Sequence, residues 1–165
     1  MLSEISRLFS YSGLAMSKLG RIRQLALGDW IVLPQLIASA FIVVLALKAF
    51  GWQRVARSIQ SRSRGSRLRH LPFLHLRYSM DDLVPLVDMA SSIFPRNRCL
   101  VRSMMMLWLL RARGERAELV LGVRKRAGNF EAHAWTVSGQ EPIGESAEAI
   151  EQFNVIARSE TYPET

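Results

Sequence analysis

The sequence of 165 residues is poor in cysteine, and Cys99 is the single one. One cysteine excludes an intramolecular disulfide, and the lack of a Cys-x-x-Cys pair excludes a zinc ribbon or a dithiol redox site. A Gly-rich phosphate loop is also missing, and the three histidines have no close ligand spacing with the cysteine. We therefore expect no metal and no cofactor, and a reducing compartment, most simply the cytoplasm.

Acidic residues are missing from residues 54–77, although the same segment is rich in arginine and the whole chain carries a formal net charge of +8. The arginines are Arg54, Arg57, Arg62, Arg64, Arg67, Arg69 and Arg77. A basic segment suits an anionic partner such as lipid headgroups, nucleic acid or an acidic peptide. Because like charges at this density extend a chain, we interpret the segment as a solvated connector and expect no nucleic-acid partner.

A secretory signal peptide is not evident, because Glu4 and Arg7 interrupt the apolar residues near the N-terminus. Charge is also missing from Trp30 to Leu47, a run near the length that crosses a membrane. Pro34 near its start argues against a span, and a helix buried against the rest of the protein or a partner needs the same residues. Cytoplasmic location with or without membrane association therefore stays open.

Composition divides the chain into four parts. Residues 1–52 predict a helical apolar extension, residues 53–78 a basic connector, residues 79–157 a globular domain and residues 158–165 a tail. The hydrophobic fraction of 49% and the charged fraction of 22% fit a folded chain and not a disordered one.

The first helix of the globular domain should begin near Ser79 and end near Ile93. A hydroxyl and two carboxylates before an apolar-periodic stretch are typical of a helix N-terminus. We expect Asp82 to be the N-cap, because Pro85 then falls in the first turn, where proline is tolerated.

A second helix from Cys99 to about Arg113 has almost no polar face, so it should be buried nearly all round. Strands are expected over residues 117–125 and 130–137, with a short third one over 141–143. A buried helix followed by an antiparallel meander predicts an α+β domain.

Cys99 would lie at the start of this buried helix. Unpaired backbone N–H groups, the positive end of the helix dipole and the nearby Arg98 and Arg102 all favour thiolate over thiol. The same N–H groups can hold an oxyanion during acyl transfer. A lone cysteine is more often a small buried hydrophobic residue, so its position alone does not decide its role.

His133 lies in the middle of the second expected strand, on the same face as Glu131 and Trp135. A histidine there is usually a surface group or a structural hydrogen-bonding group. A cysteine at a helix start and a histidine on a later strand are nevertheless what cysteine-based acyl chemistry needs. A third group should fix the imidazole tautomer. Glu141 and Glu145 are both available, and we prefer Glu145, where the third strand would be ending.

Several short segments in a fixed order carry a resemblance to a known family. They are Cys99-Leu-Val-Arg-Ser103, Leu109-Leu-Arg-Ala-Arg-Gly114, Leu121-Gly-Val-Arg124, Ala132-His-Ala-Trp135, Gly139-Gln-Glu-Pro-Ile-Gly-Glu145 and Phe153-Asn-Val-Ile156. With these segments the chain resembles the lasso-peptide leader peptidases, the B-type maturation proteins of the transglutaminase-like cysteine protease superfamily. The resemblance covers roughly residues 80–157, about half of the chain.

The resemblance implies a papain/transglutaminase-like fold, with the Cys-bearing helix packed on a small antiparallel sheet. It implies Cys99 as nucleophile, His133 as general base and Glu145 as orienting acid. The implied reaction cuts a ribosomal precursor peptide between its leader and core, before an asparagine-synthetase-like partner closes a macrolactam. Residues 1–78 lack the strands of a fused leader-binding domain, which implies a stand-alone peptidase served by a separate leader-binding protein.

Two other functions fit the same sequence. An acyltransferase or transglutaminase would use the same residues but pass the acyl group to an amine instead of water. A basic membrane-associated adaptor would use the run from Trp30 to Leu47 and the arginines after it, with Cys99 and His133 in structural roles.

Overall fold

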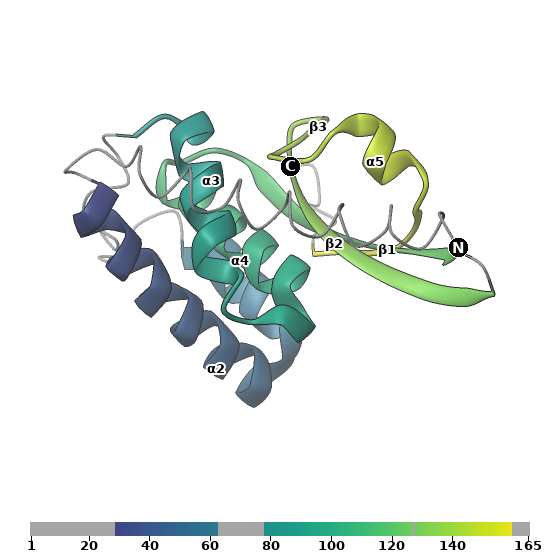
Figure 1. The fold of residues 1–165 in the computed structure, drawn as a ribbon, viewed down its shortest axis with the longest axis horizontal. Coiled ribbons are helices and arrows are strands. Elements are labelled where there is room, and N and C mark those ends of the chain that lie inside the picture. Colours follow the sequence, from purple (N-terminus) through teal and green to yellow (C-terminus); the bar gives the residue numbers. More distant parts are fainter. Residues whose placement is uncertain (1–28, 63–77, 127, 160–165) are drawn as a thin grey trace, which may run out of the picture. The chain divides into compact units, whose positions relative to one another are not determined.

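The computed structural model of the chain describes residues 29–62, 78–126 and 128–159 (Figure 1). Residues from Val32 onward belong to one compact unit. Along the chain the elements are α2 (Asp29–Arg62), α3 (Met80–Ser91), the 3₁₀ turn η3 (Pro95–Asn97), α4 (Arg98–Ala112), β1 (Ala117–Arg126), β2 (Asn129–Ser138), β3 (Glu141–Pro142), α5 (Ala147–Glu151) and β4 (Asn154–Arg158). Residues 1–28, 63–77, 127 and 160–165 lie outside the described part. They include parts of the expected extension, basic connector and tail.

The strands form one antiparallel sheet in the order β3-β2-β1-β4. Helix α4 packs on β2 and β1, and α3 packs on α4. This arrangement confirms the predicted α+β class, with a Cys-bearing helix on a small antiparallel sheet and an apolar helix before it. The sequence did not predict α5 and β4, because each is only five residues long and neither has a clear apolar period.

Helix α4 is buried because almost every side chain on it is apolar. Met104, Met105 and Leu107 are at most 1% exposed. Its docking on β2 is fixed by a reciprocal pair of hydrogen bonds. The Oγ of Ser103 donates to the carbonyl of Ala134 (2.8 Å), and the Oγ1 of Thr136 donates to the carbonyl of Ser103 (2.7 Å). These bonds fix the N-terminal part of α4 beside the middle of β2.

The N-cap of α3 is Ser79, so the prediction of Asp82 at this position is wrong. The Oγ of Ser79 accepts the backbone N–H of Asp82 (3.1 Å) and donates to its carboxylate (2.6 Å). This two-way contact satisfies an N–H group that the first helical turn leaves unpaired. Pro85 consequently lies inside the helix and not in its first turn.

Helix α2 crosses the expected boundary between the apolar extension and the basic connector, because it continues to Arg62. Gly51 interrupts it with a φ of 74°, a left-handed conformation that glycine adopts without strain. The division of the chain into an extension, a connector, a domain and a tail stays a prediction.

Helix α2 has an inner and an outer face, and both are apolar. The inner face includes Val32, Leu36, Ala40 and Val43, each at most 3% exposed. The outer face carries Ile42 and Leu45, which are 59% and 64% exposed. By length and composition the segment Trp30–Ser61 could cross a membrane, with a mean hydropathy of 2.4 in its most apolar window and 28% of that window buried.

Two contacts tie α2 to the rest of the compact unit. The ring of Phe41 meets that of Phe94 edge-on at 5.0 Å between centroids. Near the other end of α2, the Nε2 of Gln60 donates to the Oγ of Ser159 (2.8 Å). The run from Trp30 to Leu47 is therefore at least partly packed on protein, which leaves its outer face to be explained.

Candidate active site

Cys99 occupies the first turn of α4, directly after η3, as the sequence predicts. The thiol is partly buried and not in a disulfide. A hydrogen bond with His133 is the main cause that lowers the pKa of Cys99 below its usual value. Burial opposes this shift, while the backbone N–H groups of Ala134 and Leu100 add to it. A hydrogen-bond partner and oriented N–H groups thus favour the thiolate.

His133 lies on β2 opposite Gly122 of β1. Its ring stacks on Trp135 at 6.1 Å and lies 5.3 Å from the ring of Phe153. The hydrogen bond with Cys99 and then the one with Glu145 raise the pKa of His133 to about 9, although burial opposes the shift. The imidazole is therefore charged at neutral pH and donates from both ring nitrogens.

Glu145 follows β3, and its Oε1 lies 3.3 Å from the Nε2 of His133. This contact leaves Nδ1 of the ring for the thiol. Burial alone would raise the pKa of Glu145, but the hydrogen bond with His133 and the charge of Arg102 outweigh it, so the pKa is lowered. The carboxylate stays ionised next to the imidazole.

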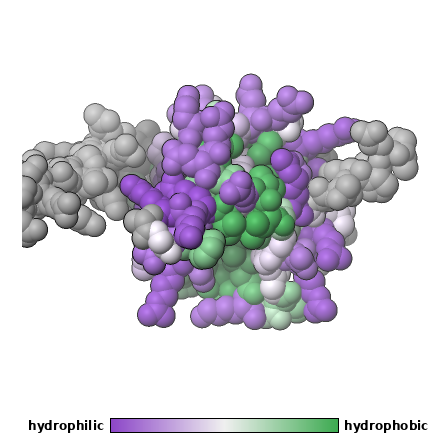
Figure 2. Space-filling model, turned by 90° about the vertical axis from the view of Figure 1, so that its right-hand side faces the viewer, coloured by the Kyte–Doolittle hydropathy of each residue, from purple (hydrophilic) through white to green (hydrophobic). Residues whose placement is uncertain are grey.

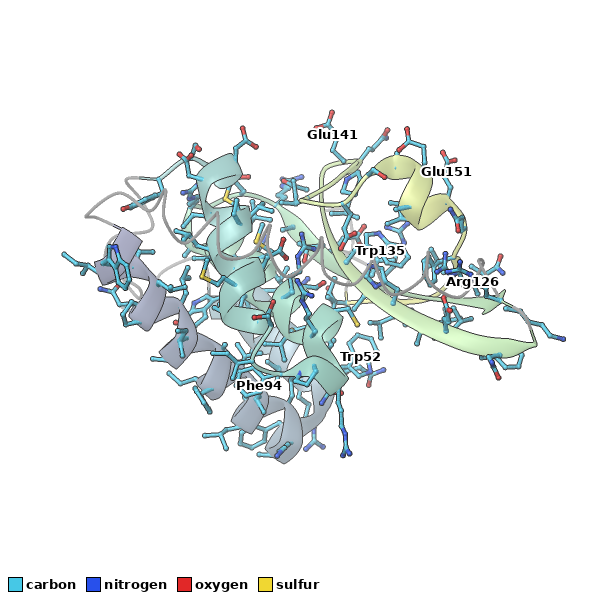
Figure 3. All side chains as sticks on the ribbon, in the orientation of Figure 1. Trp52, Phe94, Arg126, Trp135, Glu141 and Glu151 are labelled. Carbon is cyan, nitrogen blue, oxygen red and sulfur yellow. The ribbon has the colours of Figure 1, made fainter. Side chains whose placement is uncertain are left out.

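The geometry distinguishes the two acids between which the sequence left a choice. Glu141 is exposed at the start of β3, and its side chain projects outward there (Figure 3). Glu145 is the acid in contact with His133. The structure therefore brings Cys99, His133 and Glu145 together, the three residues that the sequence singled out.

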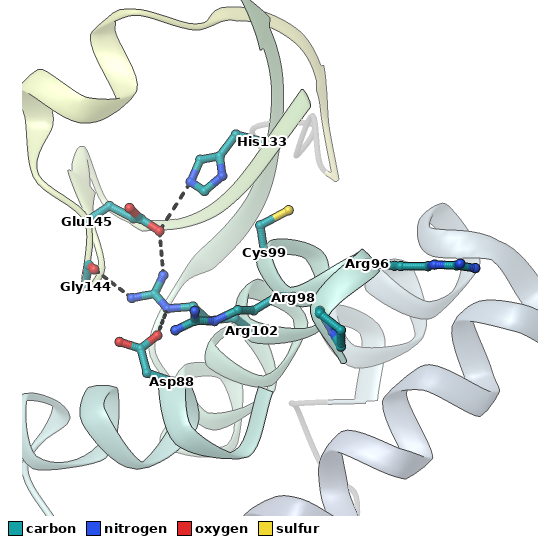
Figure 4. Close-up of a pocket in the computed structure, with 9 residues that line it drawn as sticks. Asp88, Arg96, Arg98, Cys99, Arg102, His133, Gly144 and Glu145 are labelled. Carbon is teal, nitrogen blue, oxygen red and sulfur yellow. Dashed lines mark hydrogen bonds and ion pairs between the residues drawn. The ribbon is translucent and has the colours of Figure 1, made fainter. Parts of the chain in front are cut away.

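A pocket of about 450 Å³ opens over these three side chains (Figure 4). Its lining residues are Asp88, Pro95, Arg96, Arg98, Cys99, Arg102, His133, Gly144 and Glu145. They come from α3, η3, α4, β2 and the segment after β3, so the site exists only when these elements are packed together.

Sequence reasoning missed the main function of Arg102, which it treated only as a nearby positive charge. The Nη1 of Arg102 donates to the Oε1 of Glu145 (2.7 Å), and its Nη2 donates to the carbonyl of Gly144 (2.6 Å). Its Nε forms an ion pair with Asp88 on α3. Its spacing of three residues from Cys99 places it one turn along the same helix, which was the available signal. The residues that Arg102 contacts are far from it in the sequence, so the sequence gave no signal for these contacts.

The arrangement supports acyl chemistry at a thiolate. The thiol of Cys99 can act as a nucleophile, and His133 lies where it can give a proton to a leaving group and later take one from water. Backbone N–H groups at the start of α4 are available to a developing oxyanion. Among residues 29–62, 78–126 and 128–159 no group of His, Cys, Asp and Glu is arranged to hold a metal ion.

The sequence profile of the transglutaminase-like superfamily matches residues 38–158, well over half of the chain. The chain belongs to the transglutaminase-like superfamily. No curated protein and no solved structure matches it significantly.

Membership in the transglutaminase-like superfamily indicates a cysteine peptidase or an acyltransferase. The match begins at residue 38, inside α2, so the superfamily domain includes most of the apolar helix. The match includes the buried Ala40 and Val43 of α2, whereas Val32 and Leu36 precede it.

Proposed function

We propose that this protein is a cysteine peptidase with Cys99 as nucleophile, His133 as general base and acid, and Glu145 as the acid that orients the imidazole. The observation that carries the proposal is the double engagement of His133. Its Nε2 lies 3.3 Å from the Oε1 of Glu145, and its interaction with Cys99 lowers the pKa of the thiol and raises that of the imidazole. A nucleophile, a base and an orienting group in this order are the geometric signature of covalent acyl transfer.

The proposed reaction has two steps. The thiolate of Cys99 attacks the peptide carbonyl carbon, and the oxyanion lies against the N–H groups of the α4 start. The imidazolium of His133 then gives its proton to the leaving amine, so that the C–N bond breaks and a thioester remains. In the second step His133 takes a proton from water, the hydroxide attacks the thioester, and the carboxylic acid leaves as the thiolate returns.

We propose further that the peptide is the precursor of a lasso peptide and that the cut separates leader from core. The ordered motifs from Cys99 to Ile156 support this substrate, and the superfamily match is compatible with it. The stand-alone form would need a separate leader-binding protein, and an asparagine-synthetase-like enzyme would then join the freed amine to a side-chain carboxylate.

An acyltransferase of the same superfamily is the second candidate, because the superfamily match supports it equally. The thioester would then be attacked by an amine instead of water. Product mass distinguishes the two reactions, since hydrolysis adds one water to the two fragments and transfer adds none.

The test incubates candidate precursor peptides from neighbouring short reading frames with this protein and its leader-binding partner, followed by mass spectrometry. We expect cleavage at one junction, and its loss in Cys99→Ala and His133→Ala. Glu145→Gln should lower the rate about 100-fold or more, because an amide does not stabilise the imidazolium as a carboxylate does.

Glu141→Gln is the matched control, since Glu141 is exposed on the same short segment and should tolerate the change. Equal rates for the two glutamate variants would contradict the role proposed for Glu145. Cleavage that survives Cys99→Ala would reject the peptidase mechanism and favour the structural roles that an adaptor implies.

A further inference from the structure

The charges around the pocket are unevenly paired. Its lining contains three arginines and two carboxylates. Arg102 forms ion pairs with both carboxylates, those of Asp88 and Glu145. Arg96 and Arg98 are exposed, and within the described part of the chain neither forms an ion pair or a side-chain hydrogen bond. The pocket therefore has two guanidinium groups outside its ion pairs, and the charge of Arg98 acts on Glu145 only by helping to lower the pKa of that carboxyl group.

These two arginines lie on either side of the thiol. Arg98 directly precedes Cys99 as the first residue of α4, and Arg96 lies in η3. In Figure 4 the side chain of Arg98 extends toward Arg102 and Asp88, whereas that of Arg96 extends in the opposite direction. The positive charge of the pocket therefore extends to both sides of the thiol.

We propose that Arg96 and Arg98, each on its own side of the thiol, attract a carboxylate of the substrate and so form an anion subsite, which favours a peptide with aspartate or glutamate next to the bond that is cut. The inference rests on the proposed function and adds a substrate class to the same site. A guanidinium group matches a carboxylate with two parallel hydrogen bonds. Exposed cations at the mouth of a pocket also raise the rate at which an anion arrives.

The position of the two arginines separates this subsite from an ordinary basic surface. Arg126 is also exposed, but it ends β1 and does not line the pocket. An effect caused by net charge would follow all three residues equally. An effect caused by the subsite would change only when Arg96 or Arg98 is substituted.

The experiment needs no knowledge of the natural substrate. Iodoacetate and iodoacetamide are nearly the same size and alkylate a thiolate by the same displacement of iodide, but only iodoacetate carries a carboxylate. Because Cys99 is the single cysteine, the mass of the intact protein reports its alkylation alone. The ratio of the two rates cancels changes in thiolate nucleophilicity and isolates the attraction of the pocket for the carboxylate.

We expect Arg96→Gln and Arg98→Gln each to lower the iodoacetate-to-iodoacetamide ratio about threefold, and the double variant to lower it about tenfold, as single charges at several ångströms in partly solvated surroundings do. Arg126→Gln should leave the ratio unchanged, and Arg98→Lys should keep part of it. Added salt should lower the ratio of the wild type and have less effect on the double variant.

A ratio that is unchanged in the double variant, or that falls equally in Arg126→Gln, would overturn the subsite. Alkylation does not require peptide cleavage, so the two proposals can fail separately. A ratio that falls while no precursor is cut rejects the peptidase and keeps the anion subsite. Cleavage with an unchanged ratio keeps the peptidase and rejects the subsite.

Once a cleaved peptide is known, exchanging its acidic residue next to the cut for the amide should lower kcat/KM about tenfold in the wild type and hardly at all in the double variant.

Discussion

At the scale of single residues, the chemistry depends on how Cys99, His133 and Glu145 share protons. The pKa of Cys99 is lowered and that of His133 is raised, chiefly by the hydrogen bond between them. The pair therefore favours thiolate and imidazolium over thiol and neutral imidazole. Each partner stabilises the charge of the other, so removal of one changes the titration of the other.

The first prediction concerns the thiol. The rate of alkylation of Cys99 by iodoacetamide should rise with pH at a midpoint well below that of an ordinary thiol. His133→Ala should move the midpoint upward, because the main cause of the lowered pKa is lost. The measurement is the rate of mass increase between pH 4 and 10, with Glu141→Gln as a control. The same midpoint in wild type and His133→Ala would contradict a Cys99–His133 pair.

The second prediction concerns alkaline pH. The folded pKa of His133, about 9, lies above its ordinary value of 6.5. Its contribution to folding is therefore complete below pH 6.5 and is lost as pH rises through about 9. Peptide cleavage should decline over the same alkaline range, because the leaving amine loses its proton donor. A pH profile of kcat/KM checks this, and an activity still rising at pH 10 would count against His133 as the acid.

The third prediction concerns Arg102, whose side chain is 8% exposed and joins Asp88, Glu145 and the carbonyl of Gly144. Arg102→Met should lower the free energy of unfolding by about 3 kcal/mol, because it leaves two partly buried carboxylates without their counterion. It should also shift the pH profile of Cys99 alkylation, since Glu145 is no longer held in place.

Arg158→Met provides the matched control for Arg102→Met. Arg158 pairs with Glu118, but its side chain is 51% exposed, so the loss should stay below about 1 kcal/mol. Urea unfolding measures both variants. Equal losses would show that the Arg102 network is no stronger than a surface ion pair.

At the scale of secondary-structure elements, the sheet positions the imidazole through close packing around Gly122. This glycine lies opposite His133, at an irregularity in the pairing of β1 with β4. A Cβ atom there would lie 2.7 Å from the ring of Trp135 and 2.9 Å from the Cβ of Phe153. The rings of Trp135 and Phe153 are the ones against which His133 rests.

The fourth prediction follows from this packing. Gly122→Ala should destabilise the fold by about 1–3 kcal/mol, because Trp135 or Phe153 must move to admit the methyl group. Peptide cleavage should fall more than the unfolded fraction explains, since the support of His133 moves as well. Ala132→Ser, at an exposed position of β2, is the control. Thermal unfolding and kcat measure the two effects, and full stability in Gly122→Ala would contradict the close contact.

The remaining strand, β4, closes the free side of β1 and contributes exposed apolar side chains. Val155 is 48% exposed and Ile156 is 62% exposed. Figure 2, which views the molecule from the side of the β1–β2 hairpin tip, shows an apolar area among hydrophilic side chains.

At the scale of the whole molecule, α2 determines what the protein can associate with. The inner face of α2 is buried within the compact unit, and its outer face is apolar and exposed. Lys48, Arg54 and Arg57 are exposed near its C-terminal half, and the sequence has no acidic residue between Asp29 and Asp81. Apolar side chains next to cations fit the surface of an anionic membrane. We propose that the outer face lies on such a surface while the inner face stays packed.

The fifth prediction tests this association with vesicles. The full chain should float with vesicles of phosphatidylcholine and phosphatidylserine, and Ile42→Glu/Leu45→Glu should reduce the bound fraction about tenfold or more. Neither residue is buried, so the free energy of unfolding should change by less than about 1 kcal/mol. Leu36→Ala, on the inner face, should instead cost about 2–5 kcal/mol. Full vesicle binding by the double variant would show that the outer face of α2 does not bind the membrane. A protein partner would then be the remaining candidate for this face.

The sequence alone determined the elements whose pattern is local. The apolar α4, the alternating strands β1 and β2, and the placement of Cys99 and His133 on them follow from residue periodicity and helix-start chemistry, which act over a few residues. The α+β class follows from their order. The preference for Glu145 over Glu141 rested on where a strand would end and on the family resemblance, and the geometry supports it.

Only the tertiary structure decided the features that join distant segments. Both Ser79 and Asp82 have side chains that suit an N-cap. The hydrogen bond from the backbone N–H of Asp82 to the Oγ of Ser79 shows that Ser79 is the cap of α3. Arg102 holds Glu145, although 43 positions separate them in the sequence. The inner face of α2 belongs to the compact unit because its apolar side chains find partners there, whereas composition alone describes a buried helix and a membrane helix in the same terms.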